Sequence, residues 1–290
     1  MYNPFAEKTG PEDDLALIRE SLQGSQKALE GLILRHQAWI YNIAFKMVMD
    51  HDDASDITQE ILIKVITSLS TYDPHKAAFR TWVYRIVANH VIGMKKRKFE
   101  VRINDFERYV SLIEKLPDHR PSSLPGAGIL NEELKTGCMM GMLMCLGRRE
   151  RLIFLLGAVF GVTDTVGSEI MEVSRENFRK ILSRSRKKVY SYMNGVCGHV
   201  NPGNPCRCAN KVKNFVDLGM LDAANPRYFK PEGKKVRDAL NRRYEEFHRS
   251  YYGPFTELFR DQPFYDPPDM VQWLRNMIQR EEFRDMFHVH

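Results

Sequence analysis

One segment, residues 173–189, constrains the fold of this chain more than any other. Its apolar residues recur at the spacing of one helix face, namely Phe178, Ile181, Leu182 and Val189. Basic residues occupy most other positions, and Ser174 fits an N-cap. Residues 169–173 read as the end of a preceding helix. A helix, a short turn and a basic helix predict a helix-turn-helix whose second helix enters the DNA major groove. The alternative is a solvated basic helix on an ordinary surface.

The distribution of charge supports an anionic partner more than the total charge does. The chain has 43 Lys and Arg against 37 Asp and Glu, a net charge of +6. Residues 95–98 form a second basic block, whereas residues 50–60 carry five acids. Segregated charge suits one anionic and one cationic partner at once. Chance clustering is the alternative.

Composition narrows the class of protein. A hydrophobic content of 43% predicts a folded chain. No apolar run approaches the ~18 residues of a membrane span. The N-terminus lacks the apolar core of a signal peptide. Five cysteines, an odd number, do not indicate a disulfide framework. We therefore expect a cytoplasmic protein without a membrane partner.

Helical periodicity predicts an all-α fold. We expect two small helical domains joined by a flexible linker, followed by a mainly helical C-terminal extension. The predicted boundaries are 1–98, 99–129 for the linker, 130–194, and 195–290. Within them we expect helices near 15–22, 29–48, 53–69, 79–98, 210–220, 232–250 and 268–287, and over 130–193 with breaks at Gly161 and Val173.

Three motifs, in order, resemble a known family. Residues 56–65 (Asp-Ile-Thr-Gln-Glu-Ile-Leu-Ile-Lys-Val) resemble the polymerase-binding helix of sigma-70-family factors. Residues 79–89 with the basic block 95–98 resemble the promoter −10 helix of the extracytoplasmic-function group. Residues 146–156 and 174–189 are similar to that group's C-terminal helix-turn-helix. Glycine stands at 93, 147 and 167 where that group commonly has aspartate, proline and an apolar residue.

The resemblance implies a non-enzymatic transcription initiation factor. It would bind core RNA polymerase through its largest catalytic subunits, direct it to −35 and −10 promoter elements, and help melt the −10 DNA. The polymerase-binding residues would be Asp56, Gln59 and Glu60. An anti-sigma or other regulatory protein is a further predicted partner. The alternative function is a helix-turn-helix regulator that binds DNA without polymerase.

Two sets of residues are predicted to contact promoter DNA. Unstacked bases are held by aromatic platforms, cations and base-edge hydrogen bonds. The −10 set is Tyr72, Phe79, Arg80, Trp82, Arg85, Asn89, Lys95, Lys96 and Arg97. Arg, Lys and Asn read base edges in the major groove. The −35 set is Arg175, Asn177, Arg179, Lys180, Arg184 and Lys187. Trp82 lies on the apolar face, so a place in the core is equally compatible with the pattern.

A cysteine-containing turn follows the basic helix. Cys197, His199, Cys206 and Cys208 offer four ligands of the kind that zinc prefers. No cofactor is required by the proposed activity, so zinc would be structural. Two alternatives stay open, a redox-sensing thiol group and a plain turn closed by Asn-Pro-Gly-Asn-Pro.

Overall fold

The computed structural model describes residues 11–96, 100–101, 103, 105–119, 125–228, 258–260 and 262–279. Within them the secondary structure is helical, apart from one isolated bridge between Cys197 and Cys206. The predicted all-α fold is therefore confirmed. No helix in these ranges is both long and apolar enough to cross a membrane.

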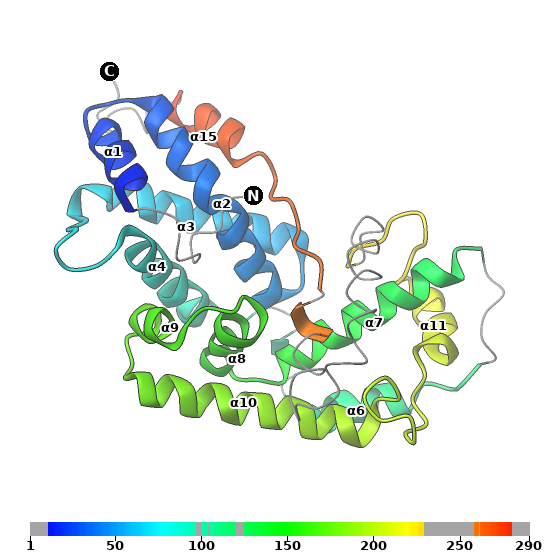
Figure 1. Cartoon of the computed structure of the whole chain (residues 1–290). Coiled ribbons are helices and arrows are strands. Elements are labelled where there is room, and N and C mark those ends of the chain that lie inside the picture. The colour runs from blue at the N-terminus through cyan, green and yellow to red at the C-terminus, as the bar shows by residue number, and fades with distance from the viewer. Residues whose placement is uncertain are drawn as a thin grey trace. The chain divides into compact units, whose positions relative to one another are not determined.

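The chain forms two compact units, each discontinuous in sequence (Figure 1). Unit 1 contains residues 1–95, 162–178 and 265–290, and unit 2 contains 96–161 and 179–264. Each predicted domain is one continuous stretch of sequence, whereas each unit combines stretches that are far apart in the sequence.

Unit 1 consists mainly of helices from the N-terminal part of the chain. Its elements are α1 (Pro11–Leu22), α2 (Gln26–Val48), α3 (His51–Thr67), the 3-10 turn η1 (Leu69–Thr71), α4 (Phe79–Gly93), α9 (Asp164–Met171) and α15 (Met270–Ile278). Side chains cap two of the long helices, since Ser25 accepts from the Ala28 N–H and Asp50 from the Asp53 N–H.

The helix predicted over 79–98 is shorter than expected. It ends at Gly93, because Met94 is extended with ψ at 159°. Lys95 and Lys96 follow outside the helix, and residues 97–99 lie outside the described residues. Glycine is a poor helix former, which favours a stop at this position.

Unit 2 holds most of the second half of the chain. Its elements are α6 (Phe106–Glu114), α7 (Ala127–Met144), α8 (Arg148–Phe154), the π-helical turn η2 (Leu155–Val159) and α11 (Cys208–Asp217). The helix α10 (Arg175–Val196) begins in unit 1 and continues into unit 2. The predicted helices over 210–220 and 268–287 correspond to α11 and α15, and that over 232–250 lies outside the described residues.

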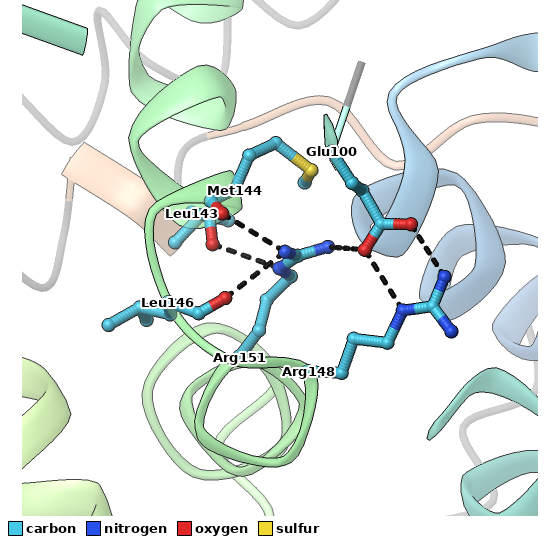
Figure 2. Close-up of polar contacts among 6 residues, drawn as sticks. All are labelled: Glu100, Leu143, Met144, Leu146, Arg148 and Arg151. Carbon is cyan, nitrogen blue, oxygen red and sulfur yellow. Dashed lines mark hydrogen bonds and ion pairs between the residues drawn. The ribbon is translucent and has the colours of Figure 1, made fainter. Parts of the chain in front are cut away.

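A buried ion cluster fixes the start of α8 to the end of α7. Glu100 is 4% exposed and accepts from both Arg148 (2.6 Å) and Arg151 (2.9 Å). Figure 2 shows the Arg151 guanidinium also donating to the backbone carbonyls of Leu143, Met144 and Leu146. Burial lowers the pKa of Arg151, and the charge of Glu100 opposes that shift. Loss of Glu100 would leave the buried Arg151 without its carboxylate, so the cluster ties residue 100 to the connection between α7 and α8.

The described part of the predicted linker, residues 99–129, contains helical structure. It holds Glu100, α6 and the buried Tyr109, whose hydroxyl donates to the Cys138 carbonyl at 2.9 Å. A Cβ on Gly141 would lie 2.6 Å from that hydroxyl, so glycine permits this close approach. The predicted linker therefore contains a helix, α6, that the sequence patterns did not predict.

The C-terminal region is anchored in both units. In unit 2, Val212 of α11 and Leu221 share a small core with Leu130 and Leu134 of α7. Arg260 donates to the Ala158 carbonyl of η2 at 2.8 Å. In unit 1, α15 packs on α2, where Arg275 forms a bidentate ion pair with Glu30.

Residue 265 is held by a buried amide of α2. The Asn42 side chain donates to the Tyr265 carbonyl at 2.7 Å and accepts from the Tyr265 N–H at 2.8 Å. The Tyr265 ring, 3% exposed, packs edge-on against Phe45 and His51. The Asn42 side chain thus satisfies both the N–H and the carbonyl of Tyr265.

Candidate nucleic-acid interface

The helix α10 separates an apolar stripe from a basic face. Its buried positions are Phe178, Ile181, Ser185, Val189 and Met193. All six residues of the predicted −35 set are exposed: Arg175, Asn177, Arg179, Lys180, Arg184 and Lys187. The Ser174 hydroxyl accepts from the Asn177 N–H at 3.2 Å, which confirms the predicted N-cap. The helix therefore presents cations and an amide along its first four turns.

A tight turn joins α9 to α10. Only residues 172–174 lie between the two helices, a length typical of a helix-turn-helix. Glu172 adopts the left-handed conformation, and the Val173 N–H bonds the Ser168 carbonyl at 3.1 Å. A Cβ on Gly167 would lie 2.4 Å from Phe178 Cζ. The aromatic ring thus occupies the space that an apolar side chain at 167 would need.

Several cations of α10, including Arg175 of the −35 set, have partners within the protein. Lys188 donates to the Glu150 carboxylate at 2.8 Å, and Arg175 to Asp164 at 3.1 Å. Arg186 is half-buried and donates to the Gly157 carbonyl of η2 at 3.3 Å. Burial lowers the pKa of Arg186, with the charge of Arg260 acting in the same direction. Lys188 and Arg186 therefore support the fold beside the exposed basic face.

The aromatic residues of the predicted −10 set pack on one another. Ring centroids are 5.2 Å apart for Tyr72 and Phe79, 5.6 Å for Tyr72 and Trp82, and 5.7 Å for Phe79 and Trp82. Phe79 is only 3% exposed, whereas Tyr72 and Trp82 are half-buried. Phe79 is a core residue in this structure, so its predicted contact with DNA is replaced by support for the two outer rings.

Two polar residues of α4 contact α9 within unit 1. Arg85 Nε donates to the Glu169 carbonyl at 2.8 Å and lies 3.8 Å from the Glu172 carboxylate. The Thr81 hydroxyl donates to the Glu169 carboxylate at 3.3 Å. Arg85 is therefore engaged by backbone and acid groups of α9. Sequence patterns did not reveal this pairing, because its partners are 84 and 88 residues apart.

The remaining −10 residues lie toward the surface. Asn89, Lys95 and Lys96 are exposed, and Arg80 is half-buried. Arg97 lies outside the described residues. Asn89 is thus the uncharged hydrogen-bonding residue of the set that solvent reaches most readily.

The predicted polymerase-binding residues share one face of α3. Asp56, Gln59 and Glu60 are spaced i, i+3 and i+4, so they neighbour one another on the helix surface. Asp56 and Glu60 are exposed and Gln59 is half-buried. Glu60 also lies 3.2 Å from His90 of α4. The arrangement offers an acidic surface beside α4.

The structure does not assemble the predicted zinc ligands. It pairs Cys197 with Cys206, but His199 is exposed on the turn. Among the residues the structure describes, no three His, Cys, Asp or Glu side chains are placed to hold a metal ion. Zinc binding at Cys197, His199, Cys206 and Cys208 stays a prediction that this geometry does not support.

Part of the N-terminal half of the chain matches a known protein family. Residues 32–98 match the family described as Sigma-70 region 2, which here runs from α2 to the basic block after α4. The match supports the resemblance to sigma-70-type factors of the extracytoplasmic-function group.

Two relatives and one solved structure illustrate the extent of similarity. The ECF RNA polymerase sigma factor SigE of Mycolicibacterium smegmatis is 29% identical over 90 residues, covering 30% of this chain and 34% of that protein. The ECF RNA polymerase sigma factor SigM of Bacillus subtilis is 26% identical over 156 residues, covering 53% and 88%. A structure of CnrH in complex with the cytosolic domain of CnrY is 18% identical, with a TM-score of 0.43, covering 63% and 98%. The matched region spans 34%, 46% and 58% of the length of three sigma factors to which this chain is similar.

Proposed function

We propose that this chain is a sigma-type transcription initiation factor. It binds core RNA polymerase, directs it to −35 and −10 promoter elements and helps to melt the −10 DNA. The observation that carries the proposal is the region 2 match over residues 32–98. Those residues form a bundle with an acidic face on α3 and Asn89 exposed on α4. A cytoplasmic location and a regulatory protein partner stay predictions.

The basic face of α10 suits duplex DNA. Arg179 and Lys180, near the start of the helix, are placed to reach base edges, and Asn177 can pair with adenine. Arg184 and Lys187 lie farther along the same exposed side and suit phosphates. The phosphate contacts position the helix, and the base-edge contacts select the −35 sequence.

The α4 surface suits unstacked −10 bases. Trp82 and Tyr72 offer half-buried rings supported from beneath by Phe79, and Asn89 offers a donor and an acceptor. Lys95 and Lys96 add positive charge for the backbone. Arg85 can join this surface only by exchanging its contacts with Glu169 and Glu172 for a phosphate.

The acidic face of α3 supplies the polymerase contact in this proposal. Asp56 and Glu60 are the exposed charges of that face, so reversing them should abolish binding. The test is size-exclusion chromatography of the purified chain with core RNA polymerase, comparing the unaltered chain with a D56K/E60K variant. The unaltered chain should co-elute, and the variant should migrate alone with an unchanged circular dichroism spectrum.

A matched control distinguishes the loss of a specific binding surface from a general loss of negative charge. Glu20 of α1 and Glu107 of α6 are also exposed, and E20K/E107K changes the net charge equally. That control should still co-elute. If the unaltered chain migrates independently of polymerase yet binds duplex DNA, the polymerase-independent regulator is the correct function. Equal loss of binding in both variants would contradict a dedicated α3 surface.

A further inference from the structure

All five cysteines of the chain gather within unit 2. Cys138 lies on α7 and Cys145 follows it as the C-cap. Cys197 follows α10 directly, Cys206 precedes α11, and Cys208 is the first residue of α11. All five cysteine residues are half-buried. All five belong to unit 2, although up to 70 positions separate them in the sequence.

One pair within this group is held by backbone structure. Cys197 and Cys206 form a parallel bridge, and the Gly198 N–H donates to the Cys206 carbonyl at 3.1 Å. The Asn204 side chain donates to the carbonyls of Asn194 (2.9 Å) and Cys197 (3.3 Å). Paired strands lie ~4.8 Å apart. That spacing falls within the ~4.4–6.8 Å range of Cα separations in disulfides.

The surroundings favour this pair over the other thiols. Burial raises the pKa of Cys138 to about 12 and that of Cys145 to about 12, which keeps both as poorly reactive thiols. The parallel bridge holds Cys197 and Cys206 on adjacent backbone segments, which distinguishes this pair from Cys138 and Cys145.

We propose that Cys197 and Cys206 form a reversible disulfide, a modification site for small-molecule disulfides such as oxidised glutathione. The thiolate of one cysteine attacks a sulfur of the oxidant, forms a mixed disulfide and releases one glutathione thiolate. The thiolate of the second cysteine then attacks the protein sulfur and releases the other glutathione. Two cysteine thiols are oxidised, one glutathione disulfide is reduced, and the two cysteine protons pass to the released thiolates.

The disulfide would close the turn over residues 197–206. Its two ends are the end of α10 and the approach to α11, which packs on α7. Oxidation therefore ties the carboxyl end of the basic helix to the core of unit 2. This chemistry does not depend on the proposed transcription function, so the two are tested separately.

The test equilibrates the full chain in buffers of reduced and oxidised glutathione, followed by alkylation and peptide mass spectrometry. Two of the five thiols should be lost, the 197–206 link should be found, and dithiothreitol should restore both thiols. Because folding holds the pair together, half-oxidation should need an oxidant ratio at least about tenfold lower in the native chain than in urea. The ratio should be unchanged in Cys145→Ser.

Cys197→Ser and Cys206→Ala should each abolish the link, and circular dichroism checks that both variants are folded. A link involving Cys138 or Cys208 instead would overturn the proposal. So would equal half-oxidation ratios in the native and the urea-unfolded chain. A metal ion retained by protein purified without chelator, protecting these thiols from alkylation, would also overturn it and would favour the zinc prediction.

Discussion

The helices α4 and α10 were both predicted to contact DNA, yet they expose their predicted residues to different extents. On α10 all six residues of the set are exposed above a buried stripe. On α4, Phe79 is buried, Trp82 is half-buried and Arg85 is bonded to α9. A surface that binds duplex DNA can be an exposed cationic helix face, whereas a surface for unstacked bases needs aromatic rings that are packed against other side chains.

The largest expected effect distinguishes a residue of α4 that supports the fold from one that is predicted to contact DNA. Phe79→Ala removes a ring that is 3% exposed, so unfolding should become easier by about 3–5 kcal/mol. Asn89→Ala alters an exposed residue and should change stability by less than about 0.5 kcal/mol. Urea unfolding followed by circular dichroism measures both. Only Asn89→Ala should then leave a stable protein that fails to expose −10 thymines to permanganate.

The next effect concerns the packing that supports α10. Gly167→Leu introduces a Cβ that would meet Phe178 at 2.4 Å, so we expect a loss of about 2–3 kcal/mol in stability. Gly93→Ala is the matched control, because a Cβ there meets nothing within 4 Å. Thermal unfolding of both variants tests this. A Gly167→Leu protein as stable as the control would show that α9 and α10 pack differently.

The third prediction divides the exposed face of α10. Arg179→Ala should weaken binding to a −35 duplex by about 1–3 kcal/mol and relax sequence preference. Lys187→Ala should weaken binding to all duplexes and reduce the salt slope by about one. Fluorescence anisotropy on specific and scrambled duplexes over a salt series distinguishes them. Identical losses on both duplexes for both variants would remove the base-reading role.

The smallest effect tests whether α9 restrains α4. Glu172→Gln removes the carboxylate 3.8 Å from Arg85, an exposed pair worth at most about 1 kcal/mol. Affinity for a single-stranded −10 oligonucleotide should therefore rise by up to about fivefold. Glu176→Gln, an exposed acid in the first turn of α10, makes the same charge change away from Arg85. An equal gain in both variants would indicate only reduced net repulsion.

Local sequence patterns predicted the helices better than the contacts between them. The spacing of Ile57, Ile61 and Val65 identified α3, and Ser174 identified the start of α10. The same patterns could not show that Phe79 belongs to the core. They also missed Glu100 in the predicted linker, because its partners Arg148 and Arg151 lie 48 and 51 residues away. Helical periodicity marks which residues share a face, but only tertiary contacts decide what covers that face.

The hydrogen bonds between Asn42 and Tyr265 have a consequence for the order of synthesis. These two residues are 223 positions apart, so the ribosome makes the amide long before the backbone it binds. At about 5–20 residues per second, that interval is roughly 10–45 seconds. During this time the emerging chain exposes the Asn42 amide and the Phe45 ring that Tyr265 later covers. Nascent unit 1 therefore passes through an incomplete stage, and its surface over α2 closes only after residue 265 has been made.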